Sequence, residues 1–203
     1  MAAGSEADML SGLRAGDPAA FRQFVDLYSA DIYGVALKLL GNEQEAEDVL
    51  QETFLSAFEA IGRFEGRSRL STWLYRIATN ASLSRLRKRR RAATVSLDDP
   101  AGDEVGGEPR SLALVDWSTA PDEQLLSTEA RLEMDRAIAE LPETLRSAFV
   151  LRDVQGMSGE ETAEILEISV QAVKTRLHRA RLWLRERLSG YFSERARVVR
   201  GRA

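Results

Sequence analysis

Polar residues able to read DNA recur at helical spacing near the C-terminus of this chain. In the segment Val170–Leu188, apolar residues repeat roughly every three to four positions, which places them on one face of a helix. Lysine and arginine can donate to guanine O6 and N7, glutamine can pair with adenine, and threonine can meet a base or the thymine methyl. Arg176 and Arg181 lie where phosphate contacts would set the register. The pattern predicts a DNA-reading face made of Gln171, Lys174, Thr175, His178 and Arg179.

The residues before this helix complete a helix-turn-helix pattern. Ser158 and Glu161 have the spacing of a capping box and open a short helix. A tight turn at Glu167 follows, and Ser169 caps the reading helix. Glycine often occupies such a left-handed turn position, and another residue there costs roughly 1 kcal/mol. The pattern is typical of a major-groove reader, although an ordinary amphipathic hairpin with a basic solvent face has it too.

A second set of residues suits unpaired nucleic acid. The segment Phe64–Asn80 begins as a polar, glycine-containing loop and continues as a helix that carries aromatic side chains. Just beyond it, six of the seven residues in Arg85–Arg91 are basic. Aromatic rings stack on unpaired bases while arginines follow the phosphates, so the combination predicts a single-strand surface. The alternative is that Trp73 and Ile77 are core residues, and packing is at least part of the role of Trp73.

The helix expected over 42–61 has an acidic outer face. A leucine lies in its middle, so the face could dock a basic helical partner, or it could be solvated surface with one stray apolar residue. A metal site built from its carboxylates is disfavoured, because no histidine and no second carboxylate-bearing helix complete it. The outer face comprises Asp48, Gln51, Glu52, Leu55 and Glu59, and the carboxylates considered for a metal are Glu43, Glu45, Glu47, Asp48 and Glu52.

Composition excludes several chemistries. The chain has 203 residues, no cysteine, one histidine and a net charge of −4. Disulfides, thiol nucleophiles and zinc-thiolate sites are excluded, and a lone His178 makes multi-histidine metal sites and a Ser-His-Asp triad improbable. No apolar run reaches the roughly 18 residues of a membrane span, and the N-terminus lacks the pattern of a signal peptide. We expect a cytoplasmic protein with no membrane insertion, no cofactor and no metal.

The elements that position these residues are all helical. Asp17-Pro18 and Asn42 with Glu45 are helix starts, and Gly41 is a helix stop. The predicted fold is all-α, with an N-terminal helical bundle and a C-terminal helix-turn-helix domain joined by an acidic flexible linker. The predicted parts are a flexible N-terminus over 1–14, a first domain over 15–91, the linker over 92–124, a second domain over 125–188 and a basic C-terminal tail over 189–203. Helices are expected over 17–40, 42–61, 69–90, 122–139, 142–153, 158–166 and 170–188.

Charge separates these parts. The linker holds eight acids against one base, while basic residues gather on either side of it. Two basic regions around an acidic one suggest two contacts with a polyanion and a spacer that avoids it. The apolar run Leu112–Trp117 within the linker has no assigned role.

Two groups of motifs, in this order, resemble a known family. The first resembles region 2 and the second resembles region 4 of extracytoplasmic-function (ECF) sigma factors, which belong to the sigma-70 family of RNA polymerase sigma subunits. The motifs are Glu45–Phe54, Phe64–Gly66 and Thr72–Asn80 for region 2, and Leu141-Pro142, Arg146, Val173–Leu177 and Arg179–Arg181 for region 4.

The resemblance implies a non-enzymatic promoter-recognition subunit that binds core RNA polymerase and promoter DNA and promotes melting. Its partners would be the clamp helices of the largest subunit and the flap region, and whether an anti-sigma factor restrains it stays open. By resemblance, core polymerase is bound by Asp48, Gln51, Glu52 and Leu55. The −10 element is bound by Phe64, Arg67, Ser68, Trp73, Arg76, Asn80 and Arg87. The −35 element is bound by Ser169, Gln171, Lys174, Thr175, Arg176, His178 and Arg179.

Three departures from the family pattern leave the promoter sequence open. Ser84 stands where aspartate is common, Gln171-Ala172 where Gly-Thr is frequent, and Glu167 where glycine is frequent. Two other classes compete with this interpretation. A stand-alone helix-turn-helix regulator would leave the acidic face unexplained, and a helical metal-dependent hydrolase would use its carboxylates.

Overall fold

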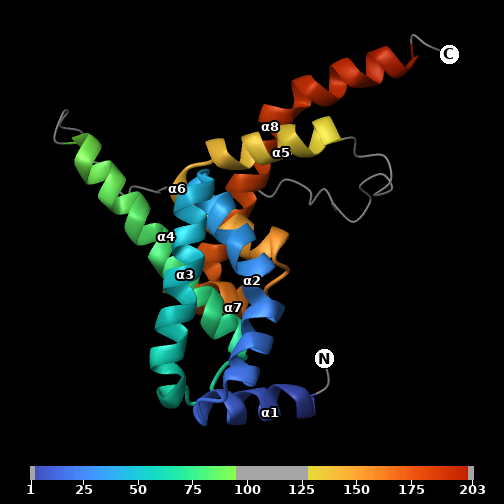
Figure 1. The fold of residues 1–203 in the computed structure, drawn as a ribbon. Coiled ribbons are helices and arrows are strands. Elements are labelled where there is room, and N and C mark those ends of the chain that lie inside the picture. Colours follow the sequence, from blue (N-terminus) through green and yellow to red (C-terminus); the bar gives the residue numbers. More distant parts are fainter. Residues whose placement is uncertain (1–2, 95–127, 201–203) are drawn as a thin grey trace.

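The structure, a computed structural model, describes residues 3–94 and 128–200, and the side chains of residues 6–92 and 129–191 (Figure 1). All regular elements in these ranges are helices, which confirms the all-α prediction. They are α1 (Ala3–Arg14), α2 (Pro18–Leu40), α3 (Glu43–Ala60), a 3₁₀ turn (Ile61–Arg63), α4 (Leu70–Thr94), α5 (Thr128–Glu140), α6 (Glu143–Phe149), a π-helical turn (Val150–Val154), α7 (Gly159–Leu166) and α8 (Val170–Arg200).

Side-chain caps set the helix starts where the sequence predicts them. The Asp17 carboxylate accepts from the amide of Ala19, 2.9 Å away, just before Pro18 opens α2. The amide of Glu45 donates to Asn42 Oδ1 at 2.9 Å. Each cap satisfies an amide that the first helical turn leaves without a partner. Between these two starts, Gly41 ends α2 with a left-handed φ of 68°.

The N-terminus is ordered, so the prediction of a flexible segment over 1–14 is wrong from residue 3 onward. Residues 3–14 form α1, which crosses one end of the first bundle (Figure 1). Met9 and Leu13 of α1 are buried in the core, and their burial stabilises a helix with a weak periodic pattern. Glu6 also accepts from the backbone amide of Leu70, so α1 caps the start of α4.

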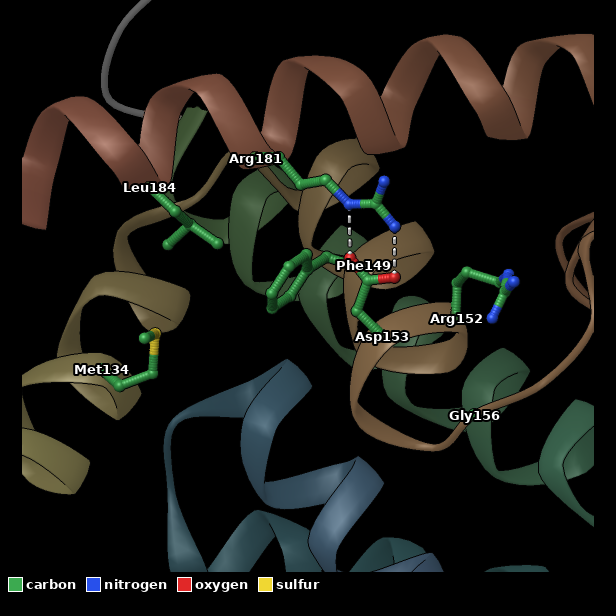
Figure 2. A pocket seen from close by; sticks show the side chains of 7 residues that line it. All are labelled: Met134, Phe149, Arg152, Asp153, Gly156, Arg181 and Leu184. Carbon is green, nitrogen blue, oxygen red and sulfur yellow. Dashed lines mark hydrogen bonds and ion pairs between the residues drawn. The ribbon is translucent and has the colours of Figure 1, made fainter. Parts of the chain in front are cut away.

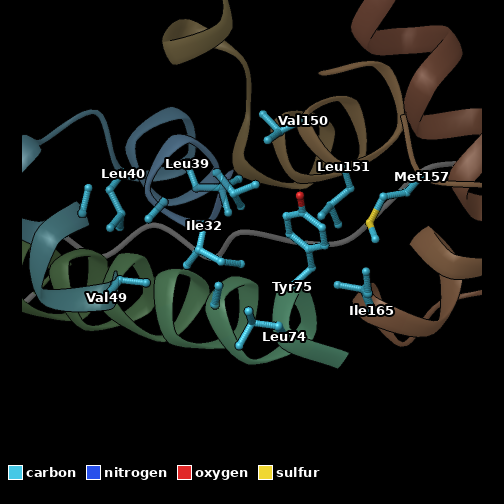
Figure 3. Close-up of a cluster of buried hydrophobic side chains, with 14 of the residues drawn as sticks. Ile32, Leu39, Leu40, Val49, Leu74, Tyr75, Val150, Leu151, Met157 and Ile165 are labelled. Carbon is cyan, nitrogen blue, oxygen red and sulfur yellow. The ribbon is translucent and has the colours of Figure 1, made fainter. Parts of the chain in front are cut away.

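The first bundle consists of α2, α3 and α4, which pack on one another. Its core contains Ile32 and Leu39 of α2, Val49 of α3 and Leu74 of α4, all essentially without solvent exposure. This core continues into the second half of the chain. Leu151 and Ile165 are buried in the same cluster, and Figure 3 shows them beside Tyr75 of α4.

The second half consists of α5 to α8. The capping box predicted at Ser158 and Glu161 is present, with both hydrogen bonds formed. The helix predicted over 142–153 is present, but its last turn is π-helical, with the amide of Gln155 bonded to the carbonyl of Val150 at 3.0 Å. Glu167 ends α7 with a φ of 56°, the one non-glycine residue with positive φ in the described part of the chain.

The last helix is longer than the sequence predicts. α8 runs without interruption to Arg200, so most of the basic tail over 189–203 is a continuation of the reading helix. Residues 95–127 lie outside the described residues. They include the predicted acidic linker except for residues 92–94, which belong to α4. They also include the Leu112–Trp117 segment and the first residues of the helix predicted over 122–139.

Candidate nucleic-acid and polymerase interfaces

The outer face of α3 is exposed as the sequence predicts. Asp48, Gln51, Glu52 and Leu55 are all solvent-exposed, and the Leu55 side chain stands 65% exposed among them. Phe58 lies one turn further and is 52% exposed. Its ring packs edge-on against Phe21 of α2, with the centroids 5.2 Å apart. Phe58 was not among the predicted docking residues, although its spacing of three residues from Leu55 places the two side chains on adjoining parts of one helix surface.

The acidic side of this face is paired within the chain. Arg85 of α4 lies 3.2 Å from the Asp48 carboxylate and 2.9 Å from that of Glu52. Arg89 lies 2.8 Å from Glu45. Part of the basic run therefore forms ion pairs with the carboxylates of α3. Arg87 of the same run is exposed, consistent with the place predicted for it.

The carboxylates of α3 do not gather around a common point. In the described ranges no group of three or more histidine, cysteine, aspartate or glutamate side chains is arranged to hold a metal ion. Glu45, Asp48 and Glu52 point at arginines instead. No helix among the described residues is long and apolar enough to cross a membrane.

The loop before α4 is fixed by packing and by α1. Phe64 is 8% exposed, and its ring packs against Trp73 with the centroids 5.1 Å apart. Arg14 of α1 donates to the Phe64 carbonyl. Phe64 was predicted as a −10 strand residue; in the structure it is buried and packs against Trp73, which is half-buried. Glu6 and Arg14 were not predicted to have a role here, because no local sequence pattern indicates that α1 holds this loop.

The other predicted single-strand residues lie in the loop before α4 and along α4 itself. Arg67 is exposed and paired with Glu65, and Ser68 is half-buried beside it. Arg76 and Asn80 follow Trp73 along α4, where Arg76 is half-buried and Asn80 is exposed. Trp73 and Asn80 are seven residues apart, which places them on one face of the helix. Trp73 and Asn80 therefore share one face in the N-terminal half of α4, and the loop that carries Arg67 leads directly into this helix.

The predicted reading helix is capped and exposed at its start. Ser169 Oγ accepts from the amide of Ala172 at 3.1 Å, so its role in the structure is that of a cap. Gln171 and Lys174 are exposed, while Val173 and Leu177 are buried on the opposite face. The remaining predicted residues of this helix are half-buried: Thr175, Arg176, His178 and Arg179.

A groove runs between the reading helix and the start of α6. It has a volume of about 530 Å³, and Pro142, Thr144 and Leu145 line one side of it. Gln171, Ala172, Thr175, Arg176 and Arg179 line the other side. Four of the predicted −35 residues therefore border one concave surface.

Arg181 of α8 forms an ion pair with Asp153 at the end of the π-helical turn. Its guanidinium forms two hydrogen bonds with the Asp153 carboxylate, at 2.8 and 2.7 Å (Figure 2). These bonds raise the pKa of Arg181. The pair borders a largely apolar pocket of about 400 Å³ that Met134, Phe149 and Leu184 also line. The pair occupies Nε and one terminal nitrogen of the guanidinium, so the structure gives Arg181 a structural role beside the predicted phosphate contact.

Family models match both halves of the chain. A model described as "Sigma-70 region 2" matches residues 24–92, and one described as "Sigma-70, region 4" matches residues 131–184. Together they cover the α3 face, the α4 surface and the reading helix. The chain belongs to the sigma-70 family of RNA polymerase sigma factors. Its sequence relatives place it in the ECF group of that family.

Similar proteins cover nearly the whole chain. The "ECF RNA polymerase sigma factor SigW" of Bacillus subtilis is 38% identical over 87% of this chain and 92% of its own length. The "RNA polymerase sigma-H factor" of Pseudomonas aeruginosa is 35% identical over 85% of this chain and 88% of its own. Among solved structures, the sigma factor RpoE in complex with the anti-sigma factor NepR from Bartonella quintana is 28% identical, with a TM-score of 0.61 over 83% of this chain and 96% of that one. CnrH in complex with the cytosolic domain of CnrY is 26% identical, with a TM-score of 0.63 over 91% of this chain and 97% of that one.

Proposed function

We propose that this chain acts in the cytoplasm as a dissociable initiation factor without enzymatic activity of its own. It docks on the clamp helices of core RNA polymerase through the α3 face and on the flap region through its second half. The surface around Trp73, Arg76 and Asn80 takes the unpaired −10 strand, and the start of α8 reads the −35 element. The observation that carries the proposal is that one chain presents an exposed apolar residue on an acidic helix, an aromatic and amide surface, and a capped reading helix.

The net charge of the chain supports the proposal that it needs polymerase in order to bind DNA tightly. The whole chain carries a net charge of −4, while DNA affinity grows with the number of phosphates that a protein neutralises. Part of the basic run is already paired with α3. The free chain should therefore bind duplex DNA weakly, and polymerase should supply the remaining contacts.

Anti-sigma proteins are a further partner class. Two of the similar solved structures are described as complexes, RpoE with the anti-sigma factor NepR and CnrH with the cytosolic domain of CnrY. The exposed Leu55 and Phe58 side chains give such a partner apolar anchors on α3. We propose that a regulator of this kind competes with polymerase for this chain.

Run-off transcription with purified core polymerase on a promoter library tests the proposal. The expected result is transcription from a subset of templates that share two elements, with none from polymerase alone. Failure to support any template-specific transcript would overturn it. Tight, sequence-specific binding of the free chain to a palindromic duplex at physiological salt would instead establish the stand-alone regulator.

A further inference from the structure

The loop that leads into α4, residues 64–69, is held at both of its ends by α1. At its start, the Arg14 guanidinium donates to the carbonyl oxygen of Phe64. At its end, a carboxylate oxygen of Glu6 accepts from the backbone amide of Leu70 at 2.9 Å. The proposed function assigns part of this loop to the unpaired −10 strand, so α1 is bonded to the ends of a strand-binding segment.

Helix α1 lies outside the part of the chain that the family model of region 2 matches. That match begins at residue 24, within α2, whereas α1 covers Ala3–Arg14. The role of α1 therefore has to be inferred from its own contacts.

The bond from Glu6 meets a need that the loop itself cannot meet. Arg69 directly precedes α4, and its carbonyl accepts from the amide of Trp73 at 3.1 Å, so Arg69 occupies the N-cap position. An arginine side chain has donors only and cannot accept from the free amides of the first turn. The Glu6 carboxylate accepts from one of them, and its negative charge suits the positive end of a helix. The start of α4, and with it the end of the loop, therefore depends on where α1 places Glu6.

Packing fixes the place of α1. Met9 and Leu13 lie between the two loop-binding residues in the sequence, and both are buried in the core. Gly12 approaches α2 so closely that a Cβ atom at this position would stand 2.6 Å from the Cβ of Ala20. Glycine permits this approach because it has no side chain. Any larger residue would move α1, and both of its bonds to the loop would move with it.

The middle of the loop is exposed. Glu65, Gly66 and Arg67 face solvent, Gly66 has a left-handed φ of 72°, and Arg67 is ion-paired to Glu65 within the loop. A loop of this kind takes its conformation from its ends. Holding the ends in place lowers the conformational entropy that is lost when a ligand binds, which raises affinity without adding a contact.

We propose that α1 is part of the −10 recognition machinery and that Glu6 and Arg14 are positioning residues for the loop over 64–69. They act through the loop and do not themselves contact the strand. This inference rests on the proposed function. Loss of either bond should weaken the capture of the unpaired strand and leave the reading helix of the second half unaffected.

Binding of the holoenzyme to a single-stranded −10 oligonucleotide tests the inference. The probe is about 15 nucleotides of the non-template strand of a template recovered by run-off transcription, and the comparison is the same strand with its −10 element scrambled. We expect Glu6→Ala and Arg14→Ala each to lower the affinity for the probe about two- to tenfold, as the loss of one hydrogen bond allows. Glu6→Gln should restore most of that affinity, because its amide oxygen can also accept from the Leu70 amide. The affinity for a duplex that carries the −35 element of the same template should stay unchanged, which a loss of folding would not permit.

Two further variants complete the test. Asp8→Ala is the matched control, because Asp8 is an exposed acid of α1 outside these contacts. Gly12→Ala keeps both loop-binding residues but displaces α1 from α2, so it should lower the affinity for the probe as the alanine variants do.

Three results would overturn the inference. They are an unchanged affinity for the probe in the Glu6→Ala, Arg14→Ala and Gly12→Ala variants, equal losses for the probe and the −35 duplex, and a Glu6→Gln variant that binds no better than Glu6→Ala. If the unaltered holoenzyme prefers the probe to the scrambled strand and one of these results is found, this inference alone falls. If run-off transcription recovers no template, the proposed function falls and this inference falls with it.

Discussion

Arg85 and Glu52 form an ion pair at 2.9 Å between the helix that carries the basic run and the helix that carries the acidic face. Asp48 shares the same guanidinium at 3.2 Å. A lysine at either acidic position would therefore stand against Arg85 and disturb the α3–α4 contact as well as any docking. Charge reversal at Asp48 or Glu52 therefore cannot separate a loss of docking from a loss of the α3–α4 contact. Leu55 is apolar and exposed, so its substitution breaks no ion pair.

Leu55 gives the cleaner test of the docking face. We expect Leu55→Arg to abolish co-purification with core polymerase, because a charged side chain cannot enter the apolar site of a partner. The free energy of unfolding should stay within about 0.5 kcal/mol of the unaltered chain, since the side chain is 65% exposed. Ala30→Arg, at an exposed position of α2, is the matched control. Recovery of the Leu55 variant with polymerase at the usual yield would remove α3 from the interface.

Arg146 connects the two halves of the chain. Its guanidinium donates to the Leu39 carbonyl at 2.7 Å and to the Leu141 carbonyl at 2.9 and 3.2 Å. Burial lowers the pKa of Arg146, as expected for a charge held partly away from water. Arg146→Met should lower the free energy of unfolding by about 1.5–3 kcal/mol, measured with urea. Arg185→Met, at an exposed position of α8, should change it by less than about 0.5 kcal/mol. Equal stability of the two variants would show that the bonds from Arg146 contribute nothing.

Glu161 makes stability depend on pH. The hydrogen bond from the Ser158 amide lowers the pKa of the Glu161 carboxyl, and bonds from Thr72 and Ser158 and the charge of Arg69 add to the effect against opposing burial. The folded pKa is below the unfolded one, so the unfolded state binds more protons and stability falls as the pH drops. The contribution is complete above the ordinary value of 4.5 and is lost as the pH falls through the lower folded pKa.

Thermal melts between pH 7 and pH 3 measure this contribution. Other carboxylates titrate in the same range, so the comparison is with Glu161→Gln, which cannot ionise. We expect the melting temperature of the unaltered chain to fall further on acidification than that of the variant. Parallel curves would mean that the pKa of Glu161 is the same in the folded and unfolded states.

How much of this fold follows from the sequence depends on how local each signal is. The caps at Asp17, Asn42 and Ser158 were predictable because each joins atoms two or three residues apart. The exposed face of α3 was predictable because helical periodicity alone sets which residues share it. The left-handed turn at Glu167 was also predictable from its place between two helices.

The contacts that change the interpretation of the site join distant residues. Glu6 caps α4 from 64 positions away, and Glu161 meets Thr72 from 89 positions away. No periodic pattern contains such pairs, because they depend on how packed helices meet. The burial of Phe64 was not predictable for the same reason, since it depends on the contacts with Trp73 and with Arg14 of α1.

The reading helix should discriminate bases through its exposed residues. Lys174 is exposed on the face opposite the buried Val173 and Leu177. Lys174→Ala should relax the base preference at one −35 position and weaken binding to the preferred base there by about 1–3 kcal/mol if the lysine donates to guanine. Arg176→Ala should weaken binding to all −35 sequences alike and make the affinity less dependent on salt, as the loss of a phosphate contact does. Binding of the holoenzyme to a −35 library measures both, and an unchanged preference in the lysine variant would move the reading surface elsewhere.

Asn80 should act after the duplex opens. It is exposed on α4, on the same face as Trp73, and its amide offers both donors and an acceptor to the edge of an unpaired base. Asn80→Ala in the holoenzyme should therefore impair promoter opening more than closed-complex binding. Ser84→Ala, one turn further along α4, is the matched control.

A pre-melted template separates the two possible roles of the asparagine. If Asn80 reads a base, the defect persists on that template and varies with the identity of one non-template base. If Asn80 only supports the loop before α4, the loss is independent of sequence and the melting temperature falls, and that result would take Asn80 out of the strand-binding surface.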